Sequence, residues 1–106
     1  MIVRMWHGMT RAEDAPEYLR FLEARAVSDY RSVPGNLGVQ ILHRLDGHRA
    51  HFLTVTWWES RAAIAAFAGE DIERAKYYPE DPGFLLELEP KVTHWEVSGV
   101  VTTTAS

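Results

Sequence analysis

Two kinds of side chain in this sequence are suited to chemistry: histidines, which titrate near neutral pH, and aromatic rings in short clusters. His7 lies near the end of the first apolar segment, and His94 lies in the closing run VTHWEV. An imidazole with an ordinary pKa of about 6.5 can act as a general base, and it can equally donate to a backbone carbonyl as a structural group. The aromatic clusters are Trp57-Trp58 and Tyr77-Tyr78.

The remaining polar residues form no catalytic or metal-binding motif. The five histidines lack the spacing of a metal site, and His48 and His51 flank a predicted turn, where we expect them to be solvated. The Glu-Asp pairs at 70–71 and 80–81 are predicted to cap helices or to face water. There is no G-x-G-x-x-G, P-loop or G-x-S-x-G motif. Nucleotide binding, phosphoryl transfer and serine hydrolysis are therefore not predicted.

The composition is that of one small globular domain. The chain has 106 residues, of which 46% are hydrophobic and 25% charged, enough for one core and too few for two ordinary domains. Its net charge is −4 and its basic residues are scattered, so we expect no binding to nucleic acid or to an anionic membrane. Cysteine is absent, and no segment is long enough to span a bilayer. We expect a cytoplasmic protein.

The first part of the chain is predicted to form a strand followed by an amphipathic helix. Residues 2–7 are rich in apolar types and end before Gly8. Asp14 and Glu17 form a capping-box pattern with Pro16 in the first turn, which predicts a helix start. Val-Pro-Gly at 33–35 should end that helix. Apolar residues recur at helical spacing and predict one buried stripe: Ala15, Tyr18, Leu19, Leu22, Ala26 and Tyr30.

The second part of the chain is predicted to form a hairpin, a helix and a strand. Residues 37–45 and 50–58 flank Asp46-Gly47, a strong hairpin signal. Ser60 should cap a helix over 61–68 that ends at Gly69, with a further helical turn or two over 69–78. A last strand is predicted over 92–97, with 101 as its outer limit. We expect a single domain over 1–101 and a frayed tail over 102–106.

This order of elements, β-α-β-β-α-β, is that of an α+β, ferredoxin-like fold with an antiparallel sheet and both helices on one face. The other sheet face would be left open. Because neighbouring strand residues point to opposite faces, Trp57 and Trp58 should lie on different sides. One indole is expected to face the helices, and the other to face a second copy of the same sheet.

The sequence resembles the antibiotic biosynthesis monooxygenase family of the dimeric α/β-barrel superfamily. The resemblance is carried by IVRMWHGMT, VPGNLGVQILHR, FLTVTWWESRAAIAAFAGEDIERA and VTHWEV, which span nearly the whole chain in order. It implies a homodimer with sheets packed face to face, and a pocket between each sheet and its own helices. It also implies that His7 and Trp58 share the pocket side as catalytic residues. Residues implied to contact substrate are Phe67, Tyr77, Tyr78 and His94.

Haem degradation, one activity of this superfamily, is disfavoured by residue type. The resemblance keeps the Trp after the third strand as Trp58, but it places His7 where the haem-degrading branch has Asn. It places Lys76 where that branch has the histidine that ligates iron. A protonated lysine has no lone pair to donate. Tyr77 or Tyr78 would have to replace it as a phenolate.

Two functions are consistent with the sequence. The first is a cofactor-independent monooxygenase that acts on an aromatic or quinol-like molecule, with His7 as base or hydrogen-bond partner. A substrate of this kind can itself reduce dioxygen once it is deprotonated, so the protein need supply only a base and a dry aromatic slot. The second is a non-catalytic dimeric α/β-barrel protein that binds a small molecule or has a stress-related role. We expect no cofactor and no metal for either function.

Overall fold

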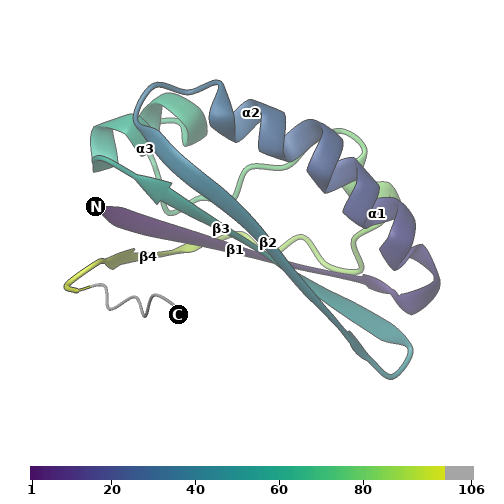
Figure 1. The fold of residues 1–106 in the computed structure, drawn as a ribbon. Coiled ribbons are helices and arrows are strands. Elements are labelled where there is room, and N and C mark those ends of the chain that lie inside the picture. The colour runs from purple at the N-terminus through teal and green to yellow at the C-terminus, as the bar shows by residue number, and fades with distance from the viewer. Residues whose placement is uncertain (100–106) are drawn as a thin grey trace.

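The computed structural model describes residues 1–99, and its elements follow the predicted order (Figure 1). The strands are β1 (Ile2–Arg11), β2 (Asn36–Asp46), β3 (Arg49–Trp58) and β4 (Thr93–Glu96). Neighbours are antiparallel, in the order β2-β3-β1-β4. The α+β, ferredoxin-like fold is thereby confirmed. The predicted tail and the outer limits of the predicted domain and last strand lie outside the described residues.

The first helical region is continuous and contains a π-helical stretch. It consists of α1 (Ala15–Phe21), the π-helical residues Leu22–Ala26 and α2 (Val27–Arg31). The predicted capping box is wrong, because the Asp14 carboxylate accepts a hydrogen bond from Arg11 Nε at 3.1 Å and caps no backbone N–H. The predicted buried stripe is confirmed at four positions that face the sheet: Tyr18, Leu22, Ala26 and Tyr30.

The second helix, α3 (Arg61–Ala68), has the predicted ends. The Ser60 hydroxyl accepts a hydrogen bond from the Ala63 N–H, and Gly69 ends the helix with a φ of 93° that glycine tolerates. No helix continues over 69–78, contrary to prediction. Backbone groups of this segment form hydrogen bonds with the residues that precede β4. For example, the Ala75 N–H donates to the Pro90 carbonyl. The irregular segment 69–92 contains a short 3-10 turn, Asp81–Gly83.

Strand β1 is longer than predicted because it continues through Gly8 in full register with β3. A Cβ at Gly8 would lie 2.3 Å from Cη2 of Trp6, so the glycine leaves the space that the indole occupies. The predicted hairpin between β2 and β3 is confirmed, with Gly47 in the turn at a φ of 61°.

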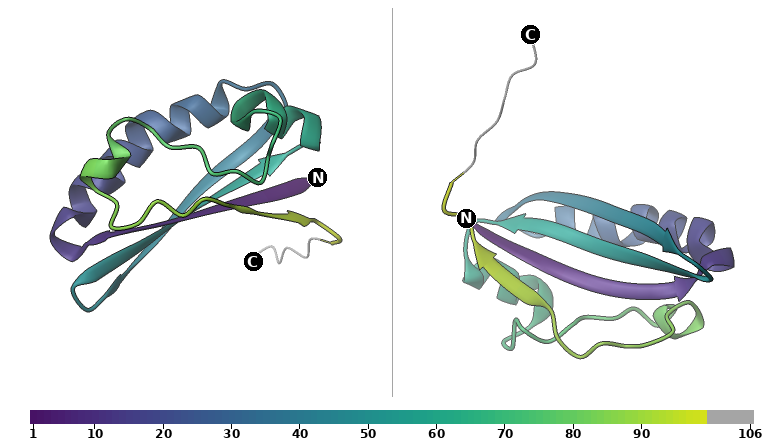
Figure 2. Two further views of the ribbon diagram at one scale, coloured as in Figure 1. Left: turned by 180° about the vertical axis from the view of Figure 1, so that it is seen from behind. Right: turned by 90° about the horizontal axis from the view of Figure 1, so that it is seen from below.

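The helices cover one sheet face, and the other is open (Figure 2). The Trp58 indole faces the helices and is 0% exposed, whereas Trp57 lies on the open face. The two indoles therefore point to opposite sides, as predicted. The core between sheet and helices is built from both layers, with Trp6, Tyr18, Phe52, Trp58 and Ile64 among its members. Within residues 1–99, none of the helices has the length and apolar character needed to cross a membrane.

Candidate functional site

A small cavity lies between the sheet and the helices. Its volume is about 20 Å³, which is room for about one water molecule. One wall comes from the long helix, with its π-helical stretch, and another from the irregular segment before β4. The lining residues are Trp6, Tyr18, Leu22, Ala26, Tyr30, Thr54, Lys76, Tyr78 and Asp81.

Aromatic packing is the reason for this small volume. The rings of Tyr30 and Phe67 are stacked at 4.6 Å, and the Trp58 ring lies 5.9 Å from Phe67. The Trp58 Nε1–H donates to the Thr56 hydroxyl at 2.7 Å, which fixes the indole against β3. Phe67 and Trp58, both predicted site residues, thus lie beside the cavity as packing partners and do not line it.

Asp81 is a buried carboxyl group in the cavity wall. It is 2% exposed and accepts hydrogen bonds from the Tyr18 hydroxyl at 2.8 Å and the Tyr78 N–H at 2.6 Å. Burial raises the pKa of Asp81 above its ordinary value. The prediction that the acidic pair at 80–81 caps a helix or faces water is therefore wrong for Asp81, whereas Glu80 pairs with Arg25 at the surface. A carboxylate with a raised pKa in a cavity is a candidate general base.

Two cations flank the ring of Phe67. The Lys76 ammonium lies 4.3 Å from the ring centroid and donates to the Phe67 carbonyl at 3.2 Å. The Arg4 guanidinium carbon lies 5.7 Å from the same centroid and is buried, and this burial lowers the pKa of Arg4. Because Lys76 also lines the cavity, an ammonium group and the Asp81 carboxyl group border the same space.

His94 lies at the edge of this interior region. It pairs with Arg4 across β1 and β4, and its Nε2 is buried without a hydrogen-bond partner among residues 1–99. Burial, followed by the charges of Arg4 and Arg61, lowers the pKa of His94. The imidazole is consequently neutral at pH 7, but it does not line the cavity.

Both predicted tyrosines lie on the irregular segment, and their hydroxyls are engaged. The Tyr77 hydroxyl donates to the Glu89 carbonyl, and the Tyr77 ring meets Trp6 edge-on at 6.2 Å. The Tyr78 hydroxyl donates to the Asp29 carboxylate at 2.7 Å. Burial is the main cause that raises the pKa of each phenol. Tyr78 lines the cavity, whereas Tyr77 packs against a residue that does.

His7 lies on the open face, so the expectation that it shares a pocket with Trp58 is wrong. It pairs with Leu53, and Ile2 pairs with Trp58, which places His7 and Trp58 at positions of opposite parity in the sheet. The β1 residue that lines the interior cavity is Trp6. Side chains alternate along a strand, so once the register of β1 with β3 and the side that Trp58 faces are known, Trp6 is identified as the residue that faces the helices.

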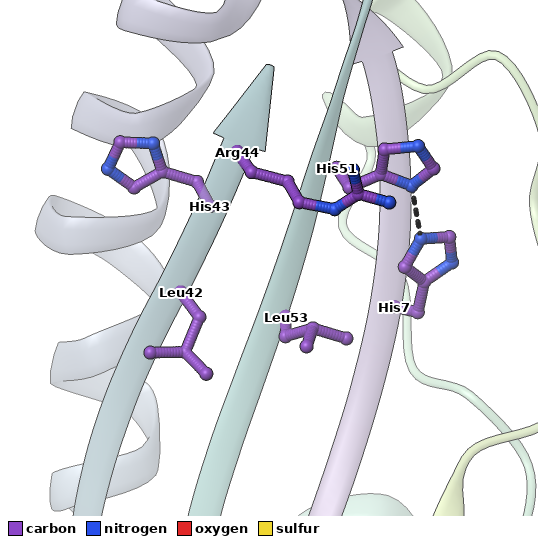
Figure 3. A pocket seen from close by; sticks show the side chains of 6 residues that line it. All are labelled: His7, Leu42, His43, Arg44, His51 and Leu53. Atoms are coloured by element: carbon purple, nitrogen blue, oxygen red, sulfur yellow. Dashed lines mark hydrogen bonds between the residues drawn. The ribbon is translucent and has the colours of Figure 1, made fainter. Parts of the chain in front are cut away.

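His7 belongs instead to a hydrogen-bonded chain on the open face. Its Nδ1 lies 2.5 Å from Glu89 Oε2, and its Nε2 lies 3.0 Å from Nδ1 of His51. Nε2 of His51 lies 3.0 Å from Asp46 Oδ2. This chain borders a hollow of about 370 Å³, which we call the open-face hollow (Figure 3). Its lining residues are His7, Leu42, His43, Arg44, His51 and Leu53.

Several residues at these two sites escape prediction from the sequence. Asp81 is one half of an acidic pair in an irregular segment, and no periodicity marks it as buried. Glu89 is 82 residues from His7 along the chain, so only the fold brings the two together. His51 was expected to be solvated, but both of its ring nitrogens have partners.

Comparison with known proteins identifies the family. Residues 1–75 match the family described as antibiotic biosynthesis monooxygenase, and this chain belongs to that family. No match is found among curated protein sequences.

Solved structures share the fold. The haem degrader MhuD from Mycobacterium tuberculosis, with two haems bound in its active site, is 24% identical, with 96% of this chain and 100% of that chain covered and a TM-score of 0.65. A putative antibiotic biosynthesis monooxygenase from Nitrosomonas europaea is 16% identical, with 93% and 100% covered and a TM-score of 0.67. One from Bacillus cereus is 9% identical, with 94% and 97% covered and a TM-score of 0.65.

The residues of this chain do not fit a haem. The Lys76 ammonium has no lone pair for iron, and it is held by the Phe67 carbonyl. Tyr77 and Tyr78 would have to ionise to act as phenolate ligands, yet the pKa of each is raised by burial.

Proposed function

We propose that this protein is a cofactor-independent monooxygenase that acts on an electron-rich phenol or quinol between the sheet and the helices. The observation that carries the proposal is the presence of both Asp81 and Lys76 in the lining of one cavity. A buried carboxylate with a raised pKa can take the phenolic proton, and an ammonium group can stabilise the phenolate that remains. The family match supports oxygenase chemistry.

In this reaction the substrate supplies all four electrons that reduce dioxygen. We take as the substrate class an anthrone-like phenol with a CH₂ carbon conjugated to the ring. Asp81 accepts the phenolic proton, and the electron-rich anion reduces dioxygen. In the net reaction the CH₂ carbon becomes a carbonyl with one oxygen atom of O₂. The other oxygen atom leaves as water with the two hydrogens of the CH₂ group.

Substrate binding requires the cavity to widen. Lys76, Tyr78 and Asp81 all lie on the irregular segment 69–92, which meets the sheet through one isolated bridge, Thr10 with Leu85. Segments with little regular hydrogen bonding open at lower free-energy cost than strands do. We therefore expect this segment to move outward, together with Tyr78, when substrate enters.

We also propose that the protein is a homodimer in the cytoplasm. No helix covers the end of the open face nearest β4 (Figure 2). Apolar side chains gather there, and Trp95 among them is 58% exposed. We define the apolar patch as Val3, Met5, Trp57 and Trp95. A second copy of the same sheet would bury it. Light scattering at micromolar concentration should give the mass of a dimer, and a monomer would contradict the proposal.

Oxygen uptake is the test of the oxygenase. Purified protein is mixed with polyphenols, dihydroquinones and anthrone-like compounds in an oxygen electrode, against protein-free blanks for autoxidation. We expect saturable uptake, strongly reduced in Asp81→Asn and Lys76→Met and unchanged in Arg20→Gln, a surface control on the outer side of α1. His7→Ala should retain turnover, because His7 lies on the other face. Full turnover in both cavity variants would contradict the proposal.

The alternative, a small-molecule-binding protein, is favoured by one observation. The aromatic rings around Phe67 fill the interior and leave about 20 Å³, as expected for a pocket that has lost its reaction, and binding there needs the same outward movement of segment 69–92. Binding of the same aromatic compounds without oxygen consumption would support this function. Tryptophan fluorescence follows such binding directly, because Trp6 lines the cavity and Trp58 lies beside it.

A further inference from the structure

Arg4 is a buried cation with few partners. Its side chain is 2% exposed and faces the helices from β1, two positions before Trp6. Its Nη2–H donates to the Arg74 carbonyl at 3.1 Å, but its Nε is buried and has no hydrogen-bond partner among residues 1–99. None of the ion pairs in that part of the chain includes Arg4. A buried charge without a counter-ion lowers the stability of a fold, so an anion would be bound favourably here.

No carboxylate of the described residues compensates the charge of Arg4. Burial lowers the pKa of Arg4, and the neighbour that opposes this shift is the phenol of Tyr30. The guanidinium carbon also lies 5.7 Å from the centroid of the Phe67 ring, which is a weaker partner than an anion. The charge of an arginine is permanent, so this positive charge does not depend on a choice of protonation state.

His94 provides a second unpaired nitrogen beside Arg4. The two residues pair directly across β1 and β4, so their side chains lie on the same face of the sheet. Nε2 of His94 is buried without a hydrogen-bond partner in the described part of the chain. Its imidazole is neutral because burial, followed by the charges of Arg4 and Arg61, lowers the pKa of His94. A neutral imidazole can carry its hydrogen on Nε2 and donate it to an acceptor.

Arg4 and the proposed base lie toward opposite ends of the interior. Asp81 accepts a hydrogen bond from Tyr18, which packs edge-on against Phe52 at 5.1 Å. Phe52 pairs with Gly8 of β1, four positions beyond Arg4. Four positions along a strand span about 13 Å, which is room for a three-ring aromatic molecule with one substituent. One molecule can therefore reach both groups if its two polar ends are far apart.

Opening of the interior removes the hydrogen bond that Arg4 makes within the described residues. Its acceptor, the Arg74 carbonyl, belongs to the irregular segment 69–92. We expect this segment to move outward when a ligand enters. A ligand that brings an acceptor to this end of the site would replace the lost carbonyl. A carboxylate is the best replacement, because its two oxygens match the planar fork of a guanidinium and the hydrogen bonds are charge-assisted.

We propose that the interior site takes an acidic ligand: an aromatic phenol that carries a carboxylate, with the carboxylate bound by Arg4 and the phenol toward Asp81. The His94 Nε2–H would donate to the same carboxylate from β4. This inference rests on the proposed function for the position of the ligand between the sheet and the helices, but it does not require turnover. Arg4 and His94 would determine specificity and take no part in the proton transfer.

Two matched probes test the acidic ligand: anthraquinone-2-carboxylate and anthraquinone-2-carboxamide. They share one ring system and differ in charge, and neither has the CH₂ group that the proposed reaction oxidises. Binding to the full chain is measured by quenching of tryptophan fluorescence, since Trp6 lines the cavity and Trp58 lies beside it. We expect the carboxylate to bind at least about tenfold more tightly than the carboxamide. Equal affinity for the two probes, or no binding of the carboxylate, would overturn the proposal.

Substitutions at Arg4 assign the preference to this side chain. Arg4→Met removes the charge and keeps an extended side chain. It should weaken carboxylate binding at least about tenfold and leave carboxamide binding unchanged. Arg4→Lys keeps the charge but loses the fork, so it should weaken the carboxylate less. Arg20→Gln, which is exposed on α1, is the control and should bind both probes as the parent does.

A purely structural role for Arg4 gives a different result. If Arg4 only held the Arg74 carbonyl, its variants would lose affinity for both probes equally, and this outcome would overturn the proposal. Unchanged carboxylate binding in Arg4→Met would also overturn it. Urea denaturation is run on each variant. We expect Arg4→Met to cost little stability, because an apolar side chain replaces an unpaired buried charge. If Arg4→Met does not fold, the two probes are compared in Arg4→Lys.

The acidic ligand and the proposed oxygenase can fail separately. Oxygen uptake with neutral phenols, together with equal binding of the two probes, would overturn the acidic ligand and leave the oxygenase. A carboxylate preference that depends on Arg4, without oxygen uptake from any phenol, would support the acidic ligand and contradict the oxygenase. The protein would then be a binding protein for aromatic acids.

Discussion

The two faces of this sheet are built from alternate residues of the same strands, yet they provide very different environments. The covered face is buried beneath the helices, and this burial displaces the pKa values of Arg4, Tyr18 and Asp81 from their ordinary ranges. On the open face, His7 and His51 are partly exposed and lie in a chain that ends in two carboxylates. The covered face is suited to proton transfer in a buried site, whereas the polar groups of the open face remain accessible within one copy of the chain.

The largest expected effect is on stability, from removal of the indole on the covered face. Trp58→Ala should lower the free energy of unfolding by about 3–5 kcal/mol, because a fully buried ring is lost and a void remains. The matched variant Trp57→Ala, on the open face, should cost less than half as much and should shift a dimer toward monomer. Urea denaturation and light scattering measure the two effects. An equal loss in the free energy of unfolding for the two variants would contradict the difference between the two sheet faces.

The next effect is on turnover and is confined to the covered face. Asp81→Asn should reduce the oxygenase rate about 100-fold, which is about 2.7 kcal/mol of activation free energy, because the proton acceptor is lost. Glu80→Gln is the control, since Glu80 pairs with Arg25 at the surface. The oxygen electrode measures both. If the two variants lose activity equally, Asp81 is not the base.

A smaller effect is expected from breaking the hydrogen-bonded chain on the open face. His51→Gln removes a link between His7 and Asp46, and it should lower the free energy of unfolding by about 1 kcal/mol or less, because these groups are partly exposed. His48→Gln, in the hairpin turn, is the matched control and should be neutral. Thermal unfolding at one fixed pH makes the comparison. A loss above about 3 kcal/mol would show that this chain is part of the core.

The smallest expected effect is a pH dependence of stability that originates in Asp81. Because burial raises its pKa in the folded protein above the ordinary 3.8, the folded state binds this proton more tightly than the unfolded state. The contribution of Asp81 is therefore fully present below pH 3.8 and is lost as the pH rises through the folded-state pKa. Stability relative to Asp81→Asn should fall over that range in urea denaturation. A constant difference between the two proteins would contradict the raised pKa.

Most of the fold can be predicted because its signals are local. Helical spacing gives the stripe that contains Tyr18 and Tyr30, and Ser60 and Gly69 mark the ends of α3 by their own backbone and side-chain preferences. The hairpin follows from Asp46-Gly47 between two alternating segments. Each of these features depends on residues within a few positions of one another, so the sequence alone determines them.

The sites are harder to predict, for two physical reasons. Strand β1 carries large side chains at both parities, so its pattern does not say whether His7 or the neighbouring Trp6 faces the helices. The contacts that define each site also join distant parts of the chain, such as Tyr18 with Asp81 and His7 with Glu89. No local preference encodes such a pair, and it exists only after the sheet and the irregular segment have come together.

The missing side chain at Gly8 has a consequence for how this scaffold can change. The Trp6 ring lies where a Cβ of residue 8 would be, at 2.3 Å from that position. Any other residue at position 8 would therefore displace the Trp6 indole or distort strand β1. Substitutions at positions 6 and 8 are therefore expected to be coupled. A side chain at position 8 would need a smaller residue at position 6. Loss of the Trp6 ring would remove one wall of the cavity, whereas the residues of the open face would stay the same.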